Sequence, residues 1–219
     1  KVIVSTEVFA PKEVDIEDDM RQTYAQQLTV RYCFTPKARP LNIEKKLMGM
    51  ALVTLKPVMD EENVIGAVMA CQFLAGNYKI VDKIVESVGE GTATIFQDDV
   101  RISTNVRDME GNRAVGTRVS EEVYNQVIKE GKPWNSRAFV VTDWYISSYE
   151  PIKNYWGDRI GILYVGTKEA FFTPLSESIL RRIYLIVIGA LLFTILLSLK
   201  ISKTLTQPIL RIIDKTKVI

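Results

Sequence analysis

Few side chains in this sequence could do chemistry. The chain of 219 residues contains no histidine, which excludes Ser-His-Asp and Cys-His catalysis and every metal site that uses histidine ligands. Its two cysteines, Cys33 and Cys71, lie far apart and form no CxxC motif, so neither a zinc ribbon nor a thioredoxin-like redox site is available. Asp98 and Asp99 could act as acid and base, but adjacent residues on a turn point apart and no nucleophile accompanies them. We therefore expect a binding protein with no catalytic residue, no cofactor and no metal.

The side chains best equipped for binding surround the segment Trp144–Tyr149, which carries three aromatic rings and two hydroxyls. That is more hydrogen-bonding equipment than a core strand needs, and it suits a pocket with an apolar wall and a few convergent polar groups. In the preceding segment Arg137 alternates with Phe139 on one face, and a guanidinium can hold a carboxylate through two hydrogen bonds. The candidate ligand-binding residues are Arg137, Phe139, Trp144, Tyr145, Tyr149 and Arg101.

Each candidate also has a purely structural explanation. Arg137 could pair with Asp143, Glu150 or solvent at a sheet edge, and the aromatic residues could fill the core. Alternation along a strand forbids Trp144 from sharing a face with both tyrosines. Both explanations stay open at the level of sequence.

The elements that must position these residues form one α+β domain. Two runs rich in β-forming residues, 92–96 and 100–105, flank a tight turn. Ser120 and Gly131 bound an expected helix whose first turn is acidic. Three further strands are expected over 137–141, 144–150 and 159–165. This order predicts an antiparallel sheet of about five strands.

An internal repeat predicts a second copy of this domain. Residues 2–8 recur as 100–106, with Ile3 in the place of Arg101, which weakens the case for that arginine. Further on, 55–68 recurs as 149–163 in the same order. We therefore expect two tandem copies, the first truncated at its N-terminal side, joined by a helix over 80–88 that has apolar residues at helical spacing.

A membrane-spanning helix is predicted near the C-terminus. The segment from Ile183 to Leu199 carries no charge, and at about 1.5 Å per residue it forms about 25 Å of helix. Arginines precede it and lysines follow it, and their long side chains can reach the headgroups. Basic residues are more numerous after the segment than before it. The positive-inside rule therefore places the C-terminal end in the cytoplasm and residues 1 to about 175 outside.

The remaining charges indicate a solvated surface. A net charge of +2 is too small to imply a nucleic-acid partner. The acidic run over 13–19 lacks the glycine and the terminal glutamate of an EF-hand loop, which favours a solvated face over a calcium site. Outside the cytoplasm a disulfide between Cys33 and Cys71 is allowed, but nothing in the sequence places the two thiols side by side.

Several segments resemble a known family. The runs ATIFQDDVRISTNV, GNRAVGTRVSEEVYNQVIKEGKPW, SRAFVVTDWYISSYEPI and DRIGILYVG are similar to the Cache-type extracytoplasmic sensor domains of prokaryotic receptors, particularly tandem Cache ectodomains. The resemblance is close over 91–166 and fair over 49–82. The run KISKTLTQPILRIID resembles the entry into a HAMP linker, with Pro208 at that family's proline.

The resemblance implies a PAS-like fold in each copy and a parallel homodimer in the cell (inner) membrane. It also implies an N-terminal helix and a first membrane segment before Lys1, and a cytoplasmic output domain beyond Ile219. Similar domains commonly bind small organic acids or amino acids. If the output domain is a histidine kinase, its phosphoacceptor lies outside this chain, which has no histidine.

The expected organisation is a truncated first Cache-like domain at 1–79, a linking helix at 80–90, a second Cache-like domain at 91–172, a transmembrane helix with flanks at 173–203 and the start of a HAMP linker at 204–219. We expect the chain to be the sensing and transmembrane part of a receptor, with a two-component sensor histidine kinase as the leading hypothesis. The alternatives are a methyl-accepting chemotaxis receptor and an ectodomain that only scaffolds or dimerises.

Overall fold

The computed structural model describes residues 2–10, 30, 32–40, 48–171 and 173–206. The chain divides into two units, Lys1–Glu169 and Ala170–Ile219, and each is described by itself. The acidic run at 13–19 and most of the expected HAMP segment lie outside the described residues.

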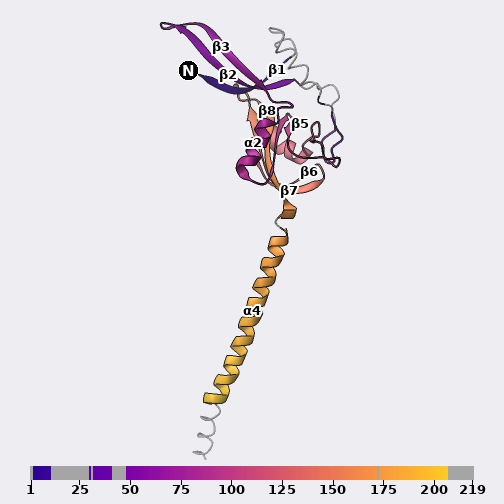
Figure 1. Ribbon diagram of the computed structural model, residues 1–219, viewed down its shortest axis with the longest axis vertical. Coiled ribbons are helices and arrows are strands. Elements are labelled where there is room, and N and C mark those ends of the chain that lie inside the picture. The colour runs from indigo at the N-terminus through magenta and orange to yellow at the C-terminus, as the bar shows by residue number, and fades with distance from the viewer. Residues whose placement is uncertain (1, 11–29, 31, 41–47, 172, 207–219) are drawn as a thin grey trace, which may run out of the picture. The chain divides into compact units, whose positions relative to one another are not determined.

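A five-stranded antiparallel sheet forms the centre of the first unit, in the order β5-β4-β8-β7-β6 (Figure 1). The expected strand pattern is therefore confirmed. The last three strands are longer than the expected runs, because a strand continues as long as its neighbour offers backbone groups for hydrogen bonding. The strands are β4 (Thr92–Gln97), β5 (Val100–Thr104), β6 (Trp134–Val140), β7 (Asp143–Lys153) and β8 (Arg159–Lys168).

One face of this sheet is covered by the segment between β5 and β6. It contains the short helix α3 (Glu121–Tyr124), which continues as the π-helical turn η1 (Asn125–Lys129) and ends before Gly131 at φ +74°. Val123 and Val127 are buried from this helix and pack in one cluster with Tyr149 and Tyr164 of the sheet. This cluster is the core beneath the candidate site.

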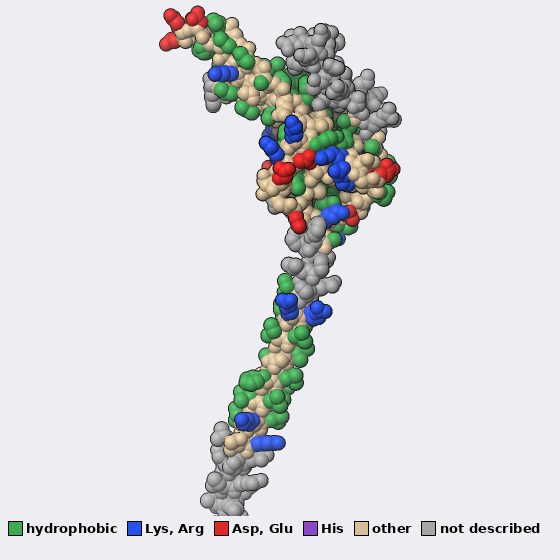
Figure 2. All heavy atoms as spheres, in the orientation of Figure 1, with side chains coloured by type: hydrophobic (Ala, Val, Ile, Leu, Met, Phe, Trp, Pro, Cys, Tyr) green, Lys and Arg blue, Asp and Glu red, His purple; other side chains and the backbone are tan. Residues whose placement is uncertain are grey.

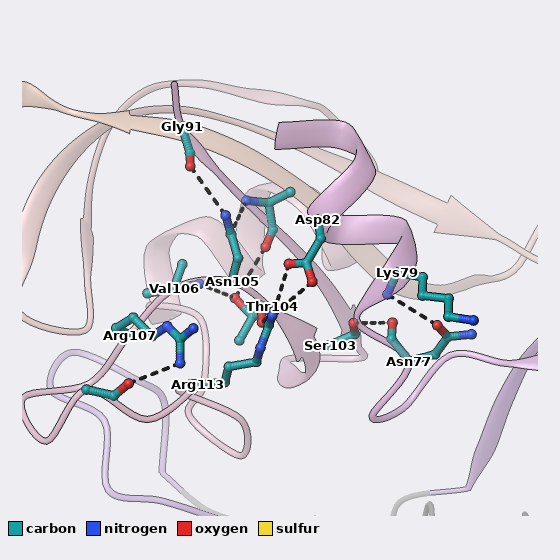
Figure 3. Close-up of polar contacts among 12 residues, drawn as sticks. Asn77, Lys79, Asp82, Gly91, Ser103, Thr104, Asn105, Val106, Arg107 and Arg113 are labelled. Atoms are coloured by element: carbon teal, nitrogen blue, oxygen red, sulfur yellow. Dashed lines mark hydrogen bonds and ion pairs between the residues drawn. The ribbon is translucent and has the colours of Figure 1, made fainter. Parts of the chain in front are cut away.

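Helix α2 (Lys79–Val88) packs on β4 and β5 through a second apolar cluster that includes Val81, Ile95 and Ile102. Polar contacts fix it in place (Figure 3). Arg113 donates to both carboxylate oxygens of Asp82 at 2.9 Å and to the Thr104 carbonyl at 2.7 Å. The predicted linking helix is therefore bound to the domain that follows it.

A second antiparallel sheet, in the order β1-β2-β3, precedes α2 and consists of β1 (Ile3–Phe9), β2 (Gly49–Asp60) and β3 (Asn63–Phe73). The repeat aligns β2 and β3 with β7 and β8, and both pairs are hairpins. It also aligns β1 with β5, but β1 pairs with β2 whereas β5 is separated from β7 by two strands. The tandem arrangement stays a prediction.

The second unit consists mainly of the long helix α4 (Thr173–Ile201), followed by the turn η3 (Ser202–Thr206). Hydrophobic side chains cover α4, and Lys and Arg side chains lie near its two ends (Figure 2). The predicted segment Ile183–Leu199 lies within a span, Ile179–Thr204, that is long and apolar enough to cross a membrane.

Candidate functional site

A strap crosses the helix-covered side of the five-stranded sheet. We use this name for residues 32–40, which lie between β1 and β2 in the sequence but bind to the later domain. Two backbone groups and one side chain of the strap are hydrogen bonded to the segment 116–121. Cys33 N–H donates to the Gly116 carbonyl (2.9 Å), Thr35 Oγ1 accepts from Arg118 N–H (2.8 Å), and the Lys37 carbonyl accepts from Glu121 N–H (2.8 Å).

A buried cluster of charged residues anchors the far end of the strap at the β4–β5 turn. Asp99, which is 3% exposed, accepts hydrogen bonds from Arg39 Nε at 2.9 Å and from Arg118 Nε at 2.9 Å. Asp98 pairs with Arg39 Nη2 at 3.0 Å. Burial acts to raise the pKa of Asp99, but the hydrogen bonds from Arg39 and Arg118 outweigh it and lower the pKa below its ordinary value.

A cleft of about 470 Å³ lies beside Lys37 of the strap, a volume suited to a small organic ligand. Helix α3 and its start form one wall, and β6 with the beginning of β7 forms the other. The residues around this strap cleft are Lys37, Ser120, Glu121, Glu122, Val123, Asn125, Trp134, Arg137, Ala138, Phe139 and Trp144.

Two polar atoms in the wall of the strap cleft are buried without a hydrogen-bond partner among the described residues, Asn125 Oδ1 and Trp134 Nε1. Leaving a buried acceptor or donor unpaired costs about 1 to 3 kcal/mol. Both residues line the same cleft, so a ligand that reached the two atoms could satisfy an acceptor and a donor together. The helix and the edge strand thus carry unused hydrogen-bonding capacity at the cleft.

The strap cleft also contains cationic and aromatic groups. The Arg137 guanidinium lies 4.2 Å from the centre of the Trp144 ring, and Arg137 Nε donates to Glu169 at 2.7 Å. Glu169 was not among the partners expected from sequence; Asp143, which was, pairs with Lys168 at 2.8 Å instead. Half of the Arg137 side chain is exposed, which leaves its other donors accessible to a ligand.

The second candidate arginine lies in the core. Arg101 is 2% exposed, donates from Nη1 to Thr117 Oγ1 at 2.6 Å and leaves Nε without a partner in the described part of the chain. Burial lowers the pKa of its guanidinium, because the surrounding groups are tyrosines rather than carboxylates. Burial also raises the pKa of Tyr149 to about 12, so this hydroxyl stays protonated at neutral pH.

Replacing Arg101 with methionine is expected to raise the free energy of unfolding by about 1 kcal/mol, because an apolar side chain removes the cost of burying a charge that no carboxylate neutralises. Urea unfolding of the full chain in detergent micelles, followed by tryptophan fluorescence, measures the change. Arg107→Met is the control, since Arg107 is exposed and bonds only to the Gly111 carbonyl among described residues. A loss of stability in Arg101→Met would contradict the expectation.

The structure divides the six sequence candidates into two groups. Arg137, Phe139 and Trp144 come together at the strap cleft, whereas Arg101, Tyr145 and Tyr149 lie in the core, so alternation does separate Trp144 from both tyrosines. Sequence reasoning missed Lys37, Asn125 and Trp134. The only sequence signals for them were the position of Asn125 in the predicted helix and that of Trp134 three residues before the predicted strand.

The other candidate sites offer weaker evidence for ligand binding than the strap cleft does. A second cavity of about 460 Å³ lies between α2 and the opposite face of the sheet, and Ile84, Ile146 and Val165 line it together with polar residues that include Arg137. No disulfide joins Cys33 and Cys71, and the Cys33 thiol lies 3.7 Å from the Val115 carbonyl. Within the described residues, no cluster of three cysteine or carboxylate side chains could hold a metal ion.

Comparison with known families places the cleft in context. Residues 72–179 match the family described as single Cache domain 3. This part of the chain is a Cache sensor domain. No curated protein matches the chain.

The match begins at the end of β3 and contains α2, the five-stranded sheet and the start of α4. It includes every residue of the strap cleft except Lys37, which the strap brings from outside the Cache domain. Cache domains generally bind small-molecule ligands. A Cache domain followed by one helix long enough to cross a membrane indicates a membrane-anchored receptor with an extracellular sensor domain.

Proposed function

We propose that the chain is the sensing and transmembrane part of a signal-transduction receptor, and that the strap cleft of its Cache domain binds a small organic acid or an amino acid. The observation that carries the proposal is a pair of buried atoms, Asn125 Oδ1 and Trp134 Nε1, that have no hydrogen-bond partner among the described residues and belong to two residues lining one cleft. A folding role alone gives no reason to bury both without partners, because each costs stability. A ligand that bonds to both recovers that cost.

The charges around the strap cleft favour a carboxylate in the ligand. Arg137 has donors beyond the one that bonds to Glu169, and a planar guanidinium suits a carboxylate better than an ammonium does. This group supports the organic acids and amino acids expected from the resemblance over a neutral ligand.

The route from ligand to membrane helix runs along the last strand of the sheet. Arg137 lines the strap cleft and binds Glu169, and Asp143 binds Lys168, so two ion pairs connect the cleft strands to the end of β8. These pairs are partly exposed and individually weak, so a ligand can rearrange them. Glu169 lies shortly before Thr173, where α4 begins.

The wider assignment is that of a receptor in the cell (inner) membrane with the Cache domain outside and the C-terminal end in the cytoplasm. In it a parallel homodimer with tandem Cache domains passes ligand binding to a HAMP linker, and a two-component sensor histidine kinase is the leading hypothesis for the receptor type. The excess of basic residues after Leu199 supports the orientation. The alternatives from sequence are a chemotaxis receptor and a scaffold that binds no ligand. In every case this chain has no enzymatic activity of its own.

Replacing Trp134 with phenylalanine is expected to weaken ligand binding about fivefold, because the ring is kept but the N–H donor is lost. The measurement is isothermal titration calorimetry of the full chain in detergent micelles against a panel of proteinogenic amino acids and dicarboxylic and tricarboxylic acids. Trp156→Phe is the matched control, since Trp156 is 80% exposed on the β7–β8 turn.

Binding of one class from the panel, weakened by Trp134→Phe and unchanged by Trp156→Phe, supports the proposed site. If no compound binds the folded chain, direct sensing is wrong and the scaffold alternative gains support. If a compound binds both variants equally, the ligand occupies another site.

A further inference from the structure

A lysine of the strap reaches into the strap cleft. Lys37 follows Pro36 in a turn closed by a hydrogen bond from Ala38 N–H to the Thr35 carbonyl, at 3.3 Å. Its φ is +64°, the left-handed conformation that this turn position requires and that a non-glycine residue adopts at a cost. The backbone is therefore held in an unfavourable conformation at the residue whose side chain enters the cleft.

The Lys37 ammonium occupies an aromatic corner of the cleft. Nζ lies 4.5 Å from the centre of the Trp144 ring and 5.2 Å from that of Phe139, and the two rings meet edge to face at 5.5 Å. Both distances are within the range of cation–π attraction, which is strongest for tryptophan. Two rings around one ammonium form a partial cage of the kind that recognises organic ammonium groups.

Carboxylates are available at the same place. Glu121 and Glu122 line the strap cleft, and neither they nor Lys37 form an ion pair with the described residues. Arg137, the other cation beside Trp144, is neutralised by Glu169. The corner thus offers aromatic faces and unneutralised negative charge to a cation, and a side chain of the protein fills it.

The contacts of Lys37 are weaker than those of its neighbour in the strap. Arg39 is fixed by Asp98, Asp99 and the ring of Tyr124, at 3.9 Å. The Lys37 side chain is exposed, and its only side-chain interactions with the described residues are its two ring contacts. Its flexible stem can therefore swing into solvent while Arg39 keeps the strap bound.

We propose that Lys37 is a tethered competitor that occupies the ammonium subsite of the strap cleft and is displaced by the ammonium group of the ligand. This inference rests on the proposed function and narrows it to compounds that carry a primary or quaternary ammonium, such as amino acids and betaines. The ligand cation stacks on Trp144 and Phe139 near Glu121 and Glu122, and the Lys37 side chain swings into solvent while Arg39 keeps the strap bound.

The test uses choline as a probe, because it carries the quaternary ammonium without a carboxylate. Lys37→Met keeps the length of the side chain and removes the competing charge, so choline is expected to bind about tenfold more tightly than to the unmodified chain. Lys37→Arg keeps a tethered cation and is expected to bind choline as weakly as the unmodified chain. Titration calorimetry of the full chain in micelles measures the three affinities.

Two controls isolate the charge. Lys83→Met makes the same substitution on the exposed side of α2, where the Lys83 side chain forms no ion pair or ring contact with the described residues, and is expected to leave choline binding unchanged. The neutral isostere 3,3-dimethylbutan-1-ol is expected not to bind Lys37→Met. Adding Trp144→Leu to Lys37→Met is expected to abolish the gain.

Equal affinity of choline for Lys37→Met and the unmodified chain would overturn the inference, as would an equal gain in Lys37→Arg, which would indicate a loosened strap. Absence of choline binding in all variants would also overturn it. In that last case, carboxylic acids that still bind in a manner sensitive to Trp134→Phe would leave the proposed function in place.

Discussion

Asp99→Asn is expected to lower the free energy of unfolding of the Cache domain by about 3 to 5 kcal/mol, the usual cost of removing one partner from a buried ion pair. Asp99 accepts from the guanidinium groups of Arg39 and Arg118, so the substitution removes the carboxylate that these two arginines share at the β4–β5 turn. The Asp98 carboxylate remains, but it bonds only to Arg39 among the described arginines. The strap should therefore detach in this variant before the sheet unfolds.

The same cluster predicts how stability depends on pH. Because the pKa of Asp99 is lower in the folded chain than in the unfolded one, its contribution is fully present above the unfolded carboxyl pKa of about 4. It is lost as the pH falls through the lower folded value. The unmodified chain should lose stability in that acid range, and Asp99→Asn should show a smaller loss there.

Urea unfolding in detergent micelles measures both effects, because all three tryptophans, Trp134, Trp144 and Trp156, lie in the Cache domain. Asp143→Asn is the matched control. Asp143 also pairs with a cation, but both partners are about half exposed, so its loss is expected to cost less than about 1 kcal/mol. Equal effects of the two substitutions would show that the buried cluster contributes no more than a surface pair.

Gly161→Ala is expected to destabilise the Cache domain by about 3 kcal/mol or more through overpacking. A Cβ atom at Gly161 would lie 2.2 Å from the Phe96 carbonyl oxygen and 2.9 Å from Met50 Cε. The methionine can move, but the carbonyl belongs to β4, which is hydrogen bonded on both sides. The added methyl group must therefore separate β8 from β4 at this point.

Gly66→Ala provides a control from the other half of the sequence repeat. Gly66 occupies the position in β3 that Gly161 occupies in β8, and a Cβ atom there meets nothing within 4 Å. Thermal unfolding of the two variants should show a large decrease for Gly161→Ala and a change of less than about 0.5 kcal/mol for Gly66→Ala. A similar effect at both positions would contradict the close approach of β8 to β4.

The five-stranded sheet was predictable because its signals are local. The turn at Asp98 and Asp99 and the glycine-containing loop around Gly157 mark where strands end, and runs of β-forming residues lie between them. Pairing is less local, and the sequence did not determine it. Residues 2–8 look like the counterpart of β5, but β1 pairs with β2. Sequence similarity does not record which edge a strand joins.

The candidate site was predictable in part. Alternation correctly put Arg137 and Phe139 together, and the opposite faces of Trp144 and Tyr145 follow from the same rule. It could not tell which face holds the cleft. The Arg101 guanidinium is enclosed in the core. Its expected role as a pocket residue stays a prediction.

By itself the sequence determined the chemistry that the chain lacks and the kind of elements it forms. The absence of histidine, the apolar segment from Ile183 to Leu199 and the alternation in the strands all follow from composition and short-range periodicity. Only the tertiary structure decided that Lys37 lies over Trp144 and that Arg39 and Arg118 share Asp99. These partners are far apart in the chain. They meet only when the strap folds onto the Cache domain, where the ring contacts and the buried ion pairs can form.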